Sequence, residues 1–188
     1  MHKFFAATCI ALIPVLSGCE ALIIGGVVAG SAMVAEDRRT VGTMTEDEVI
    51  ENKAVSRIGD KVKDSHINVT SYNRAVLLTG EVPTEAAKAD AERIARAVEN
   101  VRSVFNELQV SGNSSMQART DDSVLTSKVK GRFVDAGKFN ALHVKVVTES
   151  GAVYLLGLVK RQEATDATEI ARTTGGVRKV VRVFEYLD

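Results

Sequence analysis

The stretch that decides the fold is residues 144–159, VKVVTESGAVYLLGLV, because a related stretch occurs earlier in the chain. Residues 67–82, INVTSYNRAVLLTGEV, lie 77 positions upstream (144 minus 67) and share an Ala-Val pair, a leucine and a glycine in register. In both stretches, apolar and polar residues alternate, a short polar turn follows, and a more continuous apolar run comes next. This pattern predicts a β-hairpin. The chain therefore contains one structural unit twice.

The match continues beyond the hairpins and organises the rest of the chain. After a one-residue deletion, Ile94-Ala95-Arg96 corresponds to Ile170-Ala171-Arg172. We predict opening helices at 46–63 and 121–136, capped by Thr45 and Thr120, second helices at 85–98 and 162–174, and closing strands at 104–110 and 180–187. The predicted fold class is α+β: two tandem domains, each helix-strand-strand-helix-strand, with a three-stranded sheet packed by two helices.

The N-terminus has the pattern of a bacterial lipoprotein signal. Lys3 precedes an apolar run at residues 4–15, and Leu16-Ser17-Gly18-Cys19 resembles a lipobox, in which the cysteine becomes the acylated N-terminus. The alternative is an ordinary cleaved signal with an incidental cysteine. Cys9 and Cys19 are the two cysteines of the 188-residue chain, so its body has no disulfide framework or cysteine metal site.

The apolar run that follows Cys19 is too short to be a second membrane span. Residues 21–35 contain three glycines, whereas a spanning helix needs about 20 apolar residues. A tether near the bilayer surface fits better. The predicted organisation is a signal peptide (1–18), a lipidated N-terminus and flexible tether (19–44), a first domain (45–110), a linker (111–118) and a second domain (119–188).

The repeated unit resembles the BON domain, a family named for bacterial osmotic-shock and nodulation proteins. The second copy carries three of the motifs of that family: Asp121-Asp122 in the opening helix, Gly151 to Gly157 (GAVYLLG), and Gly176 to Val180 (GVRKV). With the lipobox, the whole chain resembles the dual-BON lipoproteins of the Gram-negative outer membrane, which face the periplasm. The resemblance implies a role in outer-membrane integrity and enrichment at division sites through anionic phospholipids, phosphatidylglycerol and cardiolipin. In those proteins the first helix of the second domain binds the lipid.

The helix predicted at 121–136 has a face suited to that role. Leu125, Val129 and Phe133 form an apolar stripe that should pack on the sheet. The candidate phospholipid-binding residues lie on the other side: Val124, Ser127, Lys128, Lys130, Gly131 and Val134. The family helix carries tryptophan at the position of Val124 and leucine at that of Val134. A solvated face with incidental valines is the alternative.

Charge also favours the second domain as the lipid binder. Residues 45–110 contain nine basic and twelve acidic side chains, whereas residues 119–188 contain twelve basic and nine acidic ones. Their net charges are therefore −3 and +3, and basic surfaces are attracted to anionic membranes. The net charge of the whole chain is zero, which gives no electrostatic reason to expect nucleic-acid binding.

The sequence predicts a protein without catalysis. We expect no metal site, and no cofactor apart from the diacylglycerol and N-acyl chains on Cys19. His66 and His143 occupy equivalent positions and are interpreted as surface-loop residues inherited by duplication. Arg96 and Arg172 also correspond, and we expect each to pair with a nearby carboxylate.

Two other functions remain open at this stage. The chain could be a periplasmic chaperone or assembly factor for outer-membrane proteins, as the soluble dual-BON osmotic-shock protein is thought to be. It could also be a docking module only, for the outer-membrane protein insertion machinery or for regulators of peptidoglycan hydrolases.

Overall fold

The computed structural model describes residues 37–112 and 114–188. The predictions for the signal peptide, for Cys19 and for residues 21–35 lie outside this part of the chain. Among the described residues, no helix has the length and apolarity needed to cross a membrane.

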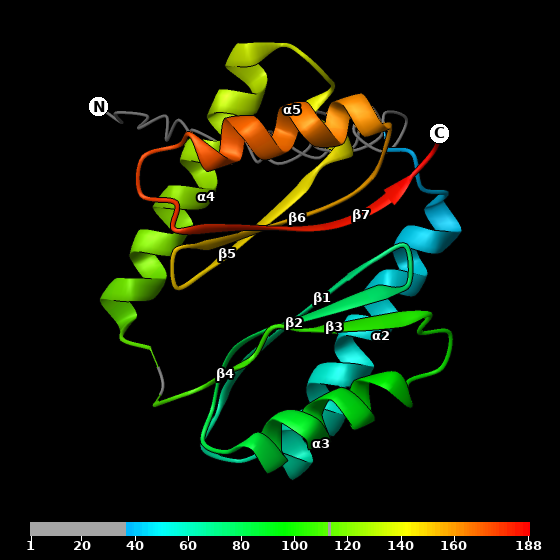
Figure 1. Cartoon of the computed structure of the whole chain (residues 1–188). Helices are drawn as coiled ribbons and strands as arrows, with labels where there is room; N and C mark the ends of the chain where they lie inside the picture. Colours follow the sequence, from blue (N-terminus) through cyan, green and yellow to red (C-terminus); the bar gives the residue numbers. More distant parts are fainter. Residues whose placement is uncertain (1–36, 113) are drawn as a thin grey trace, which may run out of the picture. The chain divides into compact units, whose positions relative to one another are not determined.

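The first repeat folds as a helix, a hairpin, a second helix and a closing strand (Figure 1). Its elements are α2 (Val41–Lys61), β1 (His66–Tyr72), β2 (Ala75–Val82), α3 (Glu85–Arg96), β3 (Ser103–Asn106) and β4 (Gln109–Val110). Strand β2 is central: β1 pairs with it antiparallel, and β3 and β4 pair with it in parallel. The closing strand predicted at 104–110 is thus split in two. The Glu107 amide still donates to the Leu78 carbonyl of β2, but the Leu108 amide donates to Asn106 Oδ1 instead.

The second repeat has the same order of elements with an additional 3₁₀ turn. Its elements are α4 (Met116–Ala136), η1 (Ala141–His143), β5 (Lys145–Glu149), β6 (Ala152–Val159), α5 (Arg161–Arg172) and β7 (Lys179–Tyr186). The sheet order is β5-β6-β7, antiparallel and then parallel. The predicted α+β fold of two αββαβ units is confirmed.

Both opening helices begin earlier than the sequence predicts. Thr40 caps α2 through its hydroxyl, which accepts from the Thr43 amide at 3.1 Å, and Ser115 caps α4 in the same way. Thr45 and Thr120, the predicted caps, lie inside the helices and donate to the carbonyls four residues earlier. A threonine followed by acidic residues has the composition of a cap, but its hydroxyl can equally bond within a helix. Residues 41–44 and 116–118 are therefore helical and not tether or linker.

The acidic motif of each opening helix has a structural role. The buried carboxylate of Asp122 accepts from the amides of Ser150 and Gly151, at 2.7 and 2.8 Å, in the turn between β5 and β6. Asp47 makes the same pair of hydrogen bonds to the β1–β2 turn. Both central residues of each turn have positive φ, as in a type I′ hairpin. The carboxylate thus fixes the helix to a tight turn that leaves its amides without strand partners.

The strand glycines are required by close approach of another backbone segment. A Cβ on Gly80 would lie 2.0 Å from the carbonyl oxygen of His66, and one on Gly157 would lie 2.4 Å from that of His143. A missing side chain would also permit the backbone to bend at these glycines. Gly80 does have a φ of +110°, but the steric constraint applies at both positions.

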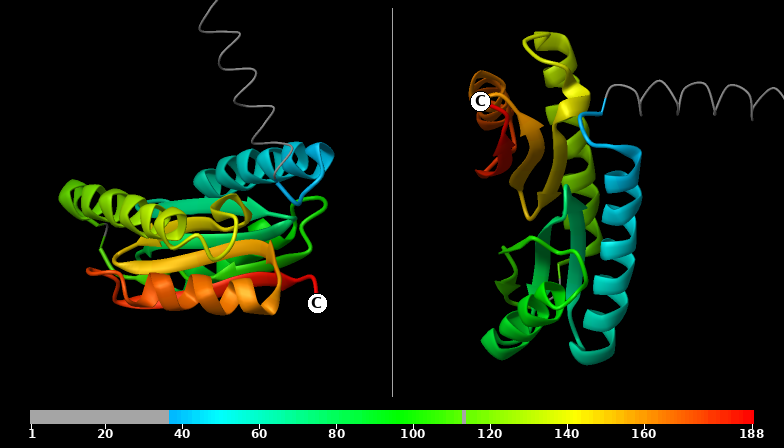
Figure 2. Two further views of the ribbon diagram at one scale, coloured as in Figure 1. Left: turned by 90° about the horizontal axis from the view of Figure 1, so that it is seen from above. Right: turned by 90° about the vertical axis from the view of Figure 1, so that its right-hand side faces the viewer.

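Three apolar clusters hold the described residues together. One lies inside each domain, between its two helices and one face of its sheet. A third contains residues of both sheets: Tyr72 and Leu77 from the first domain, with Tyr154, Leu156 and others from the second. The strands of the two domains therefore share a core, and the helices lie on their outer sides, as the second view in Figure 2 shows.

Candidate functional site

Helix α4 buries one stripe and exposes the opposite one. Leu125, Val129 and Phe133 are buried against the sheet, as predicted. Val124 and Val134 are 49% and 68% exposed. The remaining candidate residues are also exposed on this helix: Ser127, Lys128, Lys130 and Gly131. The structure thus presents all six candidate residues to solvent, and we call them the α4 face.

The two lysines of the α4 face are free of salt bridges within the part of the chain that the structure describes, since no carboxylate lies within ion-pair distance of Lys128 or Lys130. The flanking Arg132 differs. Its Nη1 donates to the Ile170 carbonyl at 3.0 Å and to the Thr174 hydroxyl at 2.8 Å. Arg132 therefore fastens α4 to α5, whereas the two lysines are available to an external anion.

The hydroxyl groups along this side of α4 bond within the helix. Ser127 Oγ donates to the Ser123 carbonyl at 3.1 Å, and Thr120 Oγ1 donates to the Met116 carbonyl at the same distance. A hydroxyl with an internal acceptor loses less on leaving water than one without. The hydroxyls therefore oppose burial of this face less than their number suggests.

Met116 is a residue of this side that the sequence analysis missed. Its side chain is 76% exposed, the largest value among the exposed apolar residues of the described chain. It precedes Val134 by eighteen positions, which is about five helical turns, so both side chains point the same way. The helix was predicted to begin at 121, and an earlier start would have included it.

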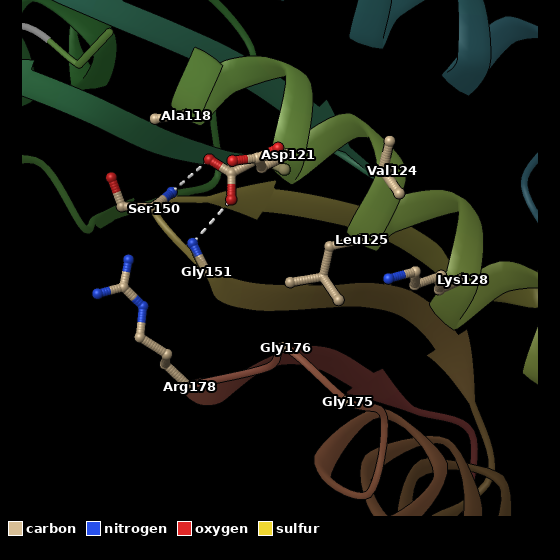
Figure 3. A pocket seen from close by; sticks show the side chains of 11 residues that line it. Ala118, Asp121, Val124, Leu125, Lys128, Ser150, Gly151, Gly175, Gly176 and Arg178 are labelled. Atoms are coloured by element: carbon tan, nitrogen blue, oxygen red, sulfur yellow. Dashed lines mark hydrogen bonds between the residues drawn. The ribbon is translucent and has the colours of Figure 1, made fainter.

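A hollow of about 370 Å³ lies beside the N-terminal half of the α4 face. Figure 3 shows Val124 and Lys128 on its helix wall, with Arg178 across it, next to Gly176. Asp122 also lines the hollow, but its oxygens are taken by the hairpin amides (dashed lines in Figure 3). No carboxylate of the described chain forms an ion pair with Arg178. The hollow is accessible to solvent, and it is lined by two cations without ion pairs, by an exposed valine and by the carboxylates of Asp121 and Asp122.

A second hollow, of about 410 Å³, lies beside the C-terminal half of the α4 face. Lys130 and Val134 line it together with Leu142, which is 46% exposed, and Lys145. Lys145 is engaged with Glu51 at 3.2 Å. The apolar surface of α4 thus continues onto the η1 turn.

Helix α2 exposes valines as well, so apolar exposure alone does not single out α4. Val49 and Val55 are 44% and 51% exposed. The two helices differ in charge: α2 has five acidic and three basic residues, whereas α4 has three acidic and four basic ones. An anionic surface would therefore attract α4 and not α2.

The repeated histidines are not surface-loop residues, which corrects the sequence analysis. His66 is the first residue of β1, and its 21%-exposed side chain places Nδ1 3.2 Å from Glu81. His143 belongs to η1, is 13% exposed, and has Nδ1 3.8 Å from Glu163. The backbone carbonyl of each histidine lies close to a strand glycine, Gly80 or Gly157.

The prediction for the repeated arginines is confirmed. Arg96 pairs with Glu92 at 2.7 Å, and Arg172 pairs with Glu169 at 2.7 Å. Both pairs lie on exposed helix surface, where such contacts contribute little to stability.

Comparison with known proteins decides the family. The BON domain model matches residues 46–112 and 121–188. The chain belongs to the BON domain family. The chain is 43% identical, over 92% of its length and 91% of the relative's, to the outer membrane lipoprotein DolP of Haemophilus influenzae. It is 34% identical to the 21 kDa hemolysin of Actinobacillus pleuropneumoniae, over 80% of this chain and 79% of that one. It is 32% identical to the osmotically-inducible protein Y of Escherichia coli, over 74% and 72%.

These similarities confirm the predicted class and location. The chain is a dual-BON envelope protein of the outer membrane, lipid-anchored and facing the periplasm. Acylation at Cys19 and cleavage of residues 1–18 remain predictions.

Proposed function

We propose that this protein binds anionic phospholipid through the α4 face and thereby helps to maintain the outer membrane, with enrichment at division sites. The observation that carries the proposal is the combination of exposed Val124 and Val134 with the unpaired Lys128 and Lys130. Apolar residues beside cations suit shallow insertion among lipid headgroups. Phosphatidylglycerol and cardiolipin are the lipids that this surface would select.

The two hollows suggest how headgroups would be held. A phosphodiester at the hollow of Figure 3 would be attracted by Lys128 and Arg178, on opposite walls, and would have to approach on the side away from Asp121 and Asp122. Each cation near an anionic surface contributes about 1 kcal/mol. The family's tryptophan is replaced by Val124 here, so we expect the aromatic contribution to membrane binding to be absent and the lysines of the α4 face to contribute more of the affinity.

The lipid anchor makes a weak site sufficient. We propose that Cys19 carries diacylglycerol and an N-acyl chain. Several acyl chains are needed for stable anchoring, since one chain alone binds a bilayer only marginally. A tethered site has a high effective concentration of its target, so α4 need not bind tightly. The proposed activity is recognition, with no reaction catalysed and no cofactor used.

The test is an NMR titration of residues 37–188, a segment that contains all three apolar clusters. Phosphatidylglycerol micelles should shift the amides of α4 saturably, and micelles of a zwitterionic lipid should not. If the anionic micelles leave α4 unchanged, the proposal is wrong. An assembly-factor role would instead show as suppressed aggregation of unfolded outer-membrane proteins without lipid. Docking to the insertion machinery or to hydrolase regulators alone would leave both assays negative.

A further inference from the structure

Three potential metal ligands converge where the two domains meet. His66 and Glu81 lie on the paired strands β1 and β2 of the first domain, and Glu149 ends β5 of the second. One ligand atom from each lies within 4.8 Å of the others. The two glutamates are 3% and 5% exposed. Buried carboxylates require compensation by a cation or by a proton.

The compensation available to these carboxylates is incomplete. Glu81 accepts from the Ser114 amide at 3.1 Å and from Ser150 Oγ at 3.4 Å, and it lies 3.2 Å from His66 Nδ1. Glu149 accepts from Asn68 Nδ2 at 2.8 Å. Across residues 37–112 and 114–188, no lysine or arginine forms an ion pair with either glutamate. Burial raises the pKa of Glu149, and the neighbouring charge of Glu81 raises it further. One histidine can neutralise at most one of the two charges.

The internal duplication provides a comparison within the same molecule. The 77-residue offset relates His66, Glu81 and Glu149 to His143, Leu158 and Tyr72. At that second location Leu158 and Tyr72 replace the two carboxylates, and Glu163 lies near His143 but is paired with Arg38, one of two arginines of the N-terminal segment in the surroundings.

The arginines at the second location make specific contacts. Arg38 Nη1 donates to the Leu158 carbonyl at 2.9 Å, and the guanidinium of Arg39 lies 4.0 Å from the Tyr72 ring centroid. At the starts of the two opening helices the offset between the repeats is 75 residues, as the equivalent Asp47 and Asp122 show. With this offset, Asn113 and Ser114 correspond to Arg38 and Arg39. The first location therefore has carboxylates at the two positions where its counterpart has Leu158 and Tyr72, and it lacks the arginine that pairs with the counterpart's carboxylate, Glu163.

We propose that His66, Glu81 and Glu149 bind a divalent transition-metal ion, with Zn²⁺ as the preferred metal. An imidazole nitrogen with two carboxylate oxygens suits zinc, and the ligands of magnesium and calcium are oxygens alone. Zinc is bound at about 2.0–2.2 Å, so the donor atoms must approach one another by side-chain rotation. A water molecule would complete four-fold coordination.

The surroundings support such a site. Asn68 and the Ser114 amide hold the carboxylates in place, as outer ligands do in metal sites. A hollow of about 250 Å³, lined by His66, Glu149 and Arg119, connects the cluster to solvent. The Arg119 guanidinium is directed to Ser114, through Nε to Oγ at 3.2 Å and Nη2 to the carbonyl at 3.3 Å. A bound ion would join β1 and β2 to β5 and so stiffen the contact between the domains.

The experiment uses the full chain, purified in detergent and stripped of metal with EDTA. Calorimetric titration with Zn²⁺ should show one saturable site per chain, and Co²⁺ should give a visible spectrum of nitrogen and oxygen ligation. His66→Gln and Glu149→Gln should each weaken Zn²⁺ binding at least tenfold. His143→Gln is the matched control, because it changes the equivalent histidine, whose one carboxylate neighbour, Glu163, is already paired with Arg38, and it should bind as the parent does.

Three results would overturn the proposal. One is the absence of stoichiometric binding, and another is equal weakening by His143→Gln and His66→Gln. The third is stabilisation of the protein by free arginine and not by Zn²⁺, which would mean that the two carboxylates bind a guanidinium group and not a metal ion. Should the variants fail to fold, the parent protein is titrated with Zn²⁺ and the NMR signals of the His66 ring nitrogens are followed. Signals that do not shift would refute the site. Lipid binding by α4 is measured separately and does not depend on this outcome.

Discussion

Replacing Val124 and Val134 together by serine should weaken lipid binding by about ten- to one-hundredfold. Complete burial of a valine side chain contributes about 1.5–3 kcal/mol. The two side chains are 49% and 68% exposed, so insertion would bury about half of one and two thirds of the other. Shallow insertion realises part of that gain, about 1–3 kcal/mol, and 1.4 kcal/mol corresponds to a factor of ten.

The assay is flotation of residues 37–188 with vesicles that contain phosphatidylglycerol, scored by the lipid concentration at half-binding. Val49→Ser with Val55→Ser is the matched control on α2, where the exposed fractions are 44% and 51%. Neither pair should change the free energy of unfolding by more than about 0.5 kcal/mol per site, because exposed positions tolerate substitution. The reasoning fails if the α4 pair binds as the parent does, or if both pairs lose affinity equally.

Three further predictions concern charge, packing and pH. Lys128→Gln with Lys130→Gln should cost about 2 kcal/mol of vesicle affinity and flatten its salt dependence in the same flotation assay; an unchanged salt slope would exclude these lysines. Gly157→Ala should lower the free energy of unfolding by about 1–3 kcal/mol or more in urea, because its Cβ would lie 2.4 Å from a backbone carbonyl oxygen. Hydrogen bonds from Arg38 lower the pKa of Glu163 to about 2. The stability that this interaction adds is complete above the unfolded pKa of 4.5 and is lost as pH falls towards 2. Glu163→Gln should therefore lower the free energy of unfolding at pH 7 by about 1–2 kcal/mol and make thermal unfolding less dependent on acid pH. An unchanged acid dependence in the variant would refute this role of Glu163.

Local pattern was sufficient to predict the repeat and its elements, because each hairpin and helix has its own periodicity. It failed where one hydroxyl has two possible partners. Thr45 and Thr120 have the sequence context of caps, but their hydroxyls bond inside the helix. It also failed at Leu108, which is 1% exposed and lies between β3 and β4. An apolar residue there reads as part of a continuous strand, although the chain leaves the ladder to bury it.

The candidate site was likewise predictable only where it depends on local helical spacing. Helical spacing predicted which side of α4 faces the sheet and which faces solvent. It could not show that Arg132 is held by α5, or that Arg178 lies across a hollow from Lys128, because those contacts join residues distant in the sequence. The His66, Glu81 and Glu149 cluster was missed for the same reason, since its ligands come from three strands and have no motif spacing.

The most direct test of the account is to map the amide shifts of residues 37–188 during titration with phosphatidylglycerol. We expect saturable shifts concentrated in residues 116–136 and around Arg178, and none with a zwitterionic lipid. Shifts concentrated on α2, or equal shifts with both lipids, would contradict it.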